Sequence, residues 1–172
     1  MKEKIDALQV ALNNELNEHK FYLKHAERTT NAAGKAMFNQ IASEEMEHYE
    51  ALKKISETWS KGGKWPGTVS LKVKGTVVGD VLKGLLKEAD RIPRGDRSDV
   101  EAIREAIEFE AQGCSYYAKL RDDCSDPAEK EFFNLMANIE HEHYVSLKET
   151  EELLTDPAQW FRSHERGGLD GA

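Results

Sequence analysis

Two short stretches of the sequence carry the same arrangement of side chains that could hold metal ions. The pattern Glu-x-Glu-His-Tyr stands at 45–49 and again at 140–144, which is 95 positions later (140 − 45). Helical residues at i and i+3 project on the same side, so the first Glu and the His of each copy can converge on one point. Carboxylates and imidazoles without thiolates are ligands that suit iron or manganese.

The repetition extends to an earlier glutamate and tyrosine in each half of the chain. The same offset pairs Glu15 with Glu110 and Tyr22 with Tyr117. The repeated unit is therefore Glu, then Tyr, then Glu-x-x-His, spread over a pair of helices. Two such units packed about a pseudo-twofold axis would bring equivalent positions together in the middle of a four-helix bundle.

The repeated glutamates and histidines fall on helical faces that are otherwise apolar. Four segments show apolar residues at alternating steps of three and four, as bundle helices do. Isolated carboxylates on such a face would be strongly destabilising, whereas four carboxylates neutralise two divalent cations. We therefore predict a dinuclear metal site. Its predicted ligands are Glu15, Glu45, His48, Glu110, Glu140 and His143.

A single Glu-x-x-His pair is a weak indication of a metal site, because glutamate-rich helices usually present their charges to solvent. The positions of the two Glu-x-x-His pairs on their helices argue against such exposure to solvent here. Both pairs fall on apolar faces, and both follow another inward glutamate at the same spacing. Glu47, His141 and Glu142 lie off the predicted ligand face, and we expect them on the surface.

The composition favours long amphipathic helices and argues against several classes of function. Of the 172 residues, 33% are charged and 39% hydrophobic, and only four are proline, which is typical of helical proteins. The net charge of -8 disfavours nucleic acid or an anionic membrane as partner. No stretch approaches the roughly 20 apolar residues of a membrane span. The first residues lack the apolar segment of a secretory signal, so we expect a cytoplasmic protein.

The fold class that these patterns predict is all-α. We expect a four-helix bundle made of two repeated helical hairpins with a long crossover, followed by a short C-terminal helix. We expect a single domain over 1–172. Its parts are a first helix pair at 1–58, a crossover at 59–99, a second helix pair at 100–154 and a C-terminal extension at 155–172.

Turn and cap residues mark the expected boundaries. The stretch Asn31–Lys35, which reads NAAGK, should break the first helix from the second. Asp126 should cap the fourth helix, with Pro127 in its first turn. Within the crossover, one short helical piece is expected around 80–90.

Together these residues resemble the rubrerythrin-type di-iron proteins of the ferritin-like superfamily. The resemblance covers about residues 3–58 and 98–154. It implies a cofactor of two iron ions (Fe2+/Fe3+), for which manganese or zinc could substitute. It also implies a role for each ligand: bridging carboxylates Glu45 and Glu140, terminal carboxylates Glu15 and Glu110, and terminal imidazoles His48 and His143.

By the same resemblance, Tyr22 and Tyr117 would donate hydrogen bonds to the ligand carboxylates, with plain core packing as the alternative. Typical members also carry a glutamate three residues after the third-helix ligand, where this chain has Gly113. The repeat-mate of that position is Glu18, which is either an additional metal ligand or a solvent-facing residue. We expect Cys114 to be a small interior filler rather than a redox group.

The resemblance implies a non-haem di-iron protein that reduces hydrogen peroxide or dioxygen. Because Cys114 and Cys124 form no CxxC pair, a rubredoxin-type site is not expected, and electrons would come from an external donor such as a rubredoxin-like protein. A ferroxidase or iron-handling protein, a metal-binding module without turnover and a hydroxylating oxygenase stay open as alternatives. A homodimer is expected, in which the crossover could exchange the third and fourth helices between chains.

Overall fold

A computed structural model describes residues 2–62, 76–86 and 94–166 of the chain. Over these ranges the chain forms helices and no strand. The helices are α1 (Lys2–Arg28), α2 (Ala32–Gly62), α3 (Val78–Leu86), α4 (Arg97–Asp123), α5 (Pro127–Thr155) and α6 (Pro157–Arg166). The predicted all-α, ferritin-like bundle is confirmed, including its short C-terminal helix.

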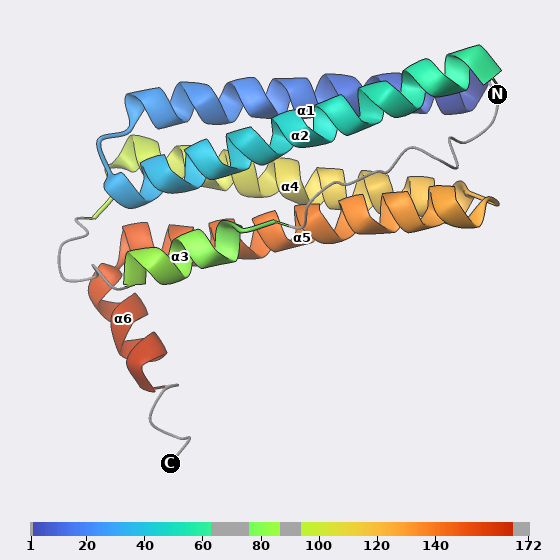
Figure 1. Cartoon of the computed structure of the whole chain (residues 1–172). Coiled ribbons are helices and arrows are strands. Elements are labelled where there is room, and N and C mark those ends of the chain that lie inside the picture. Colours follow the sequence, from blue (N-terminus) through green and yellow to red (C-terminus); the bar gives the residue numbers. More distant parts are fainter. Residues whose placement is uncertain (1, 63–75, 87–93, 167–172) are drawn as a thin grey trace.

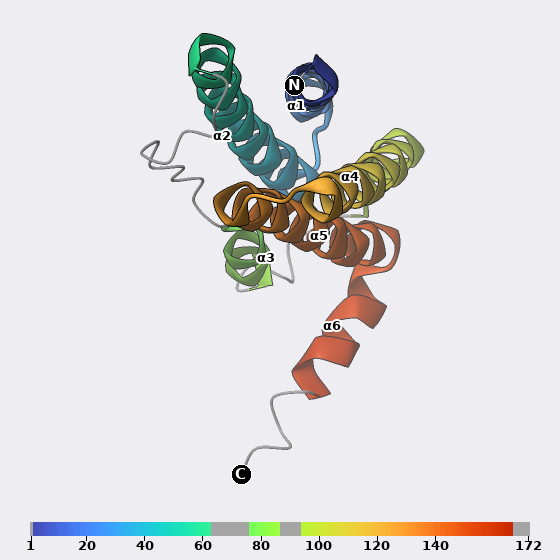
Figure 2. The same cartoon turned by 90° about the vertical axis from the view of Figure 1, so that its right-hand side faces the viewer.

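Two antiparallel hairpins, α1–α2 and α4–α5, lie against each other along the bundle (Figure 1). The view along the bundle shows the two pairs from their ends (Figure 2). The short α3 packs against α2 and α5, and α6 turns away from the end of α5. Of the predicted crossover, α3 and the residues around it are described, whereas its Gly- and Lys-rich part at 63–75 lies outside the described residues.

Side-chain caps begin the helices of the second hairpin. Asp126 accepts hydrogen bonds from the backbone N–H groups of Ala128 and Glu129, with Pro127 in the first turn, as predicted. At the start of α4, Asp96 and Asp99 form a reciprocal capping box. Such caps satisfy N–H groups that have no partner within the helix.

The predicted break between the first two helices was placed too far along the chain. Of the stretch Asn31–Lys35, only Asn31 lies outside a helix, because α2 already begins at Ala32. The Asn31 side-chain oxygen accepts from the backbone N–H groups of Ala33 at 3.0 Å and Gly34 at 3.1 Å. This is the bonding of an N-cap residue, so Gly34 belongs to the first turn of α2.

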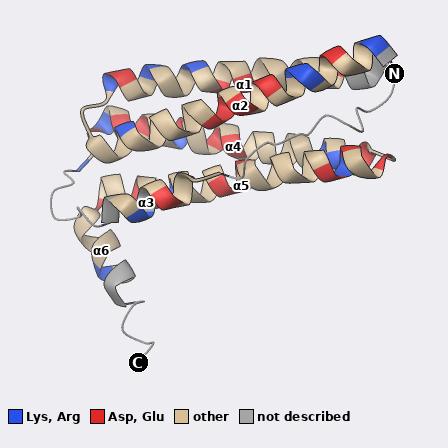
Figure 3. Cartoon of the chain, viewed as in Figure 1, with Lys and Arg blue, Asp and Glu red and all other residues tan. Residues whose placement is uncertain are grey.

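The apolar core consists of two clusters, one toward each end of the bundle. One includes Phe38 and Ile103, and the other includes Leu52 and Met136. Along each long helix, the predicted ligands fall between the residues of these two clusters. Figure 3 shows acidic positions near mid-length on all four long helices. The apolar ends therefore hold the four helices around a charged middle.

None of the helices in the described part of the chain has both the length and the apolar character needed to cross a bilayer.

Candidate metal centre

The six predicted ligands lie together in the middle of the bundle and are shielded from solvent. Each comes from one of the four long helices, which supply a Glu or a Glu-x-x-His pair. Their exposed fractions are 1% for Glu15, 0% for Glu45, 1% for His48, and 0% for Glu110, Glu140 and His143. Such burial of ionisable side chains is rare in proteins unless the charges are compensated.

These side chains form two groups that overlap. In each group, one potential ligand atom from every residue lies within 4.8 Å of the others. The first group contains Glu15 and His48, the second contains Glu110 and His143, and both contain Glu45 and Glu140. The two shared carboxylates therefore occupy the positions from which a side chain could reach two ions at once.

The donor atoms of this cluster fit a pair of divalent cations. Four of its carboxylate oxygens are buried without a hydrogen-bond partner: Glu45 Oε1, Glu110 Oε2 and both oxygens of Glu140. His143 Nδ1 lies 3.1 Å from Glu45 Oε1 without forming a hydrogen bond. Unpartnered oxygens are costly in a dry interior, and bound cations would satisfy them. The cluster is therefore compatible with a dinuclear metal site.

Without metal, the cluster shifts the protonation of its members. Burial, together with the charge of Glu45, raises the pKa of Glu15 from 4.5 to about 8, although His48 acts in the opposite direction. Burial lowers the pKa of His48, but the charge of Glu45 and hydrogen bonds to Glu15 and Glu45 outweigh it and raise the pKa to about 10. The metal-free cluster therefore holds protons that metal ions would displace.

Each inward tyrosine reaches across to the opposite hairpin. The Tyr22 hydroxyl on α1 donates to Glu110 on α4, and the Tyr117 hydroxyl on α4 donates to Glu15 on α1. Burial and the nearby carboxylates raise the pKa of both hydroxyls, so they stay protonated as donors. The two hydrogen bonds leave one oxygen of each glutamate for another partner. That these tyrosines orient metal ligands stays a prediction.

One further residue of the site was missed in the sequence. Glu44 is largely buried, and its Oε2 lies 2.7 Å from His143 Nε2. This contact holds the ring so that Nδ1 faces the cluster, as carboxylates often do for metal-binding histidines. Glu44 also accepts from the backbone N–H of Val77, beside α3. The repeat could not reveal it, because the repeat-mate of Glu44 is Ile139.

The charged neighbours of the ligands lie as the periodicity predicts. Glu47, His141 and Glu142 are exposed. Glu18 is half-buried, and its pKa is raised by burial and by the charges of Glu45, Glu110 and Glu15. Glu18 belongs to neither group of potential ligands among the described residues, so its role as an additional metal ligand stays a prediction.

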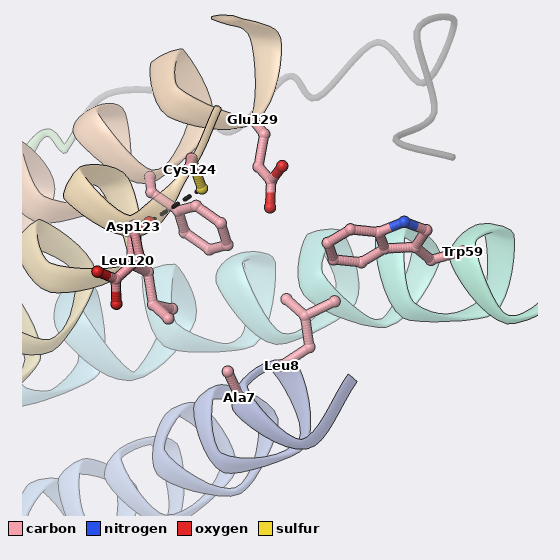
Figure 4. Close-up of a pocket in the computed structure, with 8 residues that line it drawn as sticks. Ala7, Leu8, Trp59, Leu120, Asp123, Cys124 and Glu129 are labelled. Atoms are coloured by element: carbon pink, nitrogen blue, oxygen red, sulfur yellow. Dashed lines mark hydrogen bonds between the residues drawn. The ribbon is translucent and has the colours of Figure 1, made fainter. Parts of the chain in front are cut away.

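A separate cavity of about 270 Å3 lies at one end of the bundle, where α1 begins and α2 and α4 end. Figure 4 shows Leu8 and Trp59 facing Glu129 across it. Cys124 belongs to its wall and donates to the backbone oxygen of Leu120 at 2.9 Å. None of the predicted ligands lines this cavity, so it is distinct from the metal cluster.

The two hairpins, with paired glutamates and histidines buried between them, form a ferritin-like four-helix bundle. Residues 6–76 match the family model described as Rubrerythrin. Over these residues the chain is similar to the rubrerythrins. The match covers the first copy of the repeat, and the repeat itself relates the second copy to it. No curated protein and no solved structure matched the chain.

Proposed function

We propose that this protein reduces hydrogen peroxide, or dioxygen, at a carboxylate-bridged di-iron centre. The observation that carries the proposal is the sharing of Glu45 and Glu140 between two groups of potential ligands. A bridged pair of iron ions supplies two electrons together and acts as a Lewis acid. Two electrons and two protons convert one hydrogen peroxide into two waters, so the stoichiometry of such a pair suits this substrate.

The residues of the chain contribute binding, orientation and exclusion of water to this reaction. Glu15 with His48 would hold one ion, Glu110 with His143 would hold the other, and the shared carboxylates would join them. The six side chains are at most 1% exposed, and such burial strengthens the electrostatic interactions at the centre. The matched family and the ligand chemistry favour iron in this role.

The electrons for repeated turnover would come from an external donor. A small redox protein of the rubredoxin type is the partner we propose. Among the described residues, Cys114 lies within α4 and Cys124 directly after it, and they form no disulfide. The expected homodimer stays a prediction.

Single-turnover kinetics tests the proposed reaction. Anaerobic, reduced, iron-loaded protein is mixed with hydrogen peroxide, and the visible absorption of the oxidised iron is followed by stopped flow. We expect oxidation about 100-fold faster than with the same amount of free Fe2+, because the two ions are held next to each other. One peroxide should oxidise two irons. The exposed Glu142→Ala variant should behave like the unmodified protein.

A rate equal to that of free iron would contradict the proposal and leave a metal-binding module without turnover. Continued uptake and oxidation of many Fe2+ ions per chain would contradict it in favour of iron handling.

A further inference from the structure

A cleft of about 510 Å3 lies between α1 and α4, next to the metal cluster. We refer to it as the α1–α4 cleft. Its lining includes the amides Asn14, Asn17 and Gln112, the carboxylate of Glu18, and Gly113. Since the predicted ligands are at most 1% exposed, an ion or a small molecule needs a passage between helices to reach them.

Gly113 separates the floor of the cleft from a shared ligand. A Cβ atom added to Gly113 would lie 3.2 Å from Glu140 Oε2 and 3.5 Å from Glu140 Cδ. The glycine therefore brings the cleft to within contact distance of the carboxylate, with no side chain in between. With a side chain at this position, Glu140 would have to move by a few tenths of an ångström.

The polar side chains of the cleft are suited to binding a cation. Glu18 contributes a carboxylate to the wall, and no lysine or arginine is among the described residues that line it. A divalent cation can displace the proton of a buried carboxyl group and then bind its oxygens directly. Amide and carboxylate oxygens are suitable transient ligands for a hydrated divalent cation.

We propose that the α1–α4 cleft is the entry site for divalent metal ions, in which Glu18 and the amide side chains bind the incoming ion and pass it to Glu140 beside Gly113, where no side chain stands between the cleft and the carboxylate. The proposal concerns loading of the centre and goes beyond its reaction with peroxide. It rests on the metal centre but not on the peroxidase activity. Ion transfer by this route involves ligand exchange only, without a redox step.

The rate at which metal-free protein takes up Co2+ tests this route. Binding is followed by the visible absorption of Co2+ after rapid mixing, and the final number of ions per chain is measured separately. Asn14→Trp places a large side chain in the cleft and should slow uptake about tenfold, with the same final occupancy. Asn13→Trp is the matched control. Asn13 is exposed, accepts a hydrogen bond from Gln9 and lies outside the cleft. The uptake rate of the Asn13→Trp variant should therefore equal that of the unmodified protein.

Glu18→Gln provides a second variant that keeps the shape of the cleft and removes its carboxyl group. We expect slower uptake, because an amide is a weaker ligand than a carboxylate for the incoming ion. If Asn14→Trp does not fold, the Co2+ uptake rate of Glu18→Gln alone tests the route. Equal uptake rates in the unmodified protein and the folded cleft variants would overturn the route while leaving the centre and its reaction standing. An unmodified protein that binds no Co2+ would overturn the centre and the route together.

Discussion

Replacing Glu140 by alanine is expected to abolish the dinuclear site, whereas Glu142→Ala is expected to leave it intact. Glu140 is fully buried and belongs to both groups of potential ligands. Loss of a shared ligand weakens the binding of both ions at once, so we expect a loss of metal affinity of about 100-fold or more. Glu142 is two positions away on the same helix but faces solvent, and its removal changes no ligand.

Metal content after anaerobic reconstitution and desalting measures this difference. The Glu45→Ala and Glu47→Ala pair provides an independent copy of the comparison on α2, because Glu45 is buried and Glu47 exposed. Thermal unfolding without metal separates loss of a ligand from loss of the fold. Metal-free Glu140→Ala should unfold at or above the temperature of the metal-free unmodified protein, because burying an unpartnered carboxylate is costly. Equal metal loss in Glu140→Ala and Glu142→Ala would contradict the assignment of helical faces.

The metal-free protein is expected to lose stability as the pH rises from about 5 to 10, and the metal-loaded protein is not. The pKa of Glu15 is raised from 4.5 to about 8 in the folded state. Between these values folded Glu15 holds a proton that the unfolded chain has lost, so raising the pH favours unfolding. His48, raised from 6.5 to about 10, has the same sign: its stabilisation is complete below 6.5 and lost as the pH approaches 10.

At acidic pH, the stability of the metal-free protein changes with pH in the opposite direction. The pKa of Glu45 is lowered: burial raises it, but the charges of His48 and His143 and the hydrogen bond with His48 outweigh the burial. Its contribution to stability is present above 4.5 and falls as the pH drops further. Stability of the metal-free protein should therefore be highest near pH 5 to 6, and the loss toward pH 10 should amount to several kcal/mol, at about 1.4 kcal/mol for each pKa unit.

Urea unfolding at several pH values, with and without bound metal, measures both profiles. Metal ions compete with protons for the same side chains, so their affinity should increase with pH and offset the loss seen without them. Parallel profiles with and without metal would show that the titrating groups do not bind it.

The buried cluster could be predicted from the sequence because its glutamates and histidines lie on helical faces that are otherwise apolar. Glu45 and Glu140 each interrupt an apolar helical face, and they occupy equivalent positions in the two copies of the repeat. The residues that support them leave weaker signals. Glu44 sits at the edge of the inward face of α2, and its mate Ile139 is apolar, so neither periodicity nor repetition identified its contact with His143.

Tertiary contacts supply what the pattern along the chain lacked. The sequence showed Gly113 only as a departure from the resembled family, whereas the structure shows the space that a side chain there would take from Glu140. The break between α1 and α2 was misplaced because the small residues after Asn31 were interpreted as a loop, although Asn31 can cap a helix that starts directly after it. In both cases the answer depends on contacts and hydrogen bonds that only the three-dimensional structure shows.

The number of iron ions bound per chain tests the central claim most directly. Purified protein is stripped of metal, reconstituted anaerobically with Fe2+ and desalted, and iron and protein are then quantified together with the visible spectrum after oxidation. The shared positions of Glu45 and Glu140 predict about two ions per chain, with the absorption of an oxo-bridged pair. One ion or fewer per chain, without that absorption, would contradict a dinuclear centre.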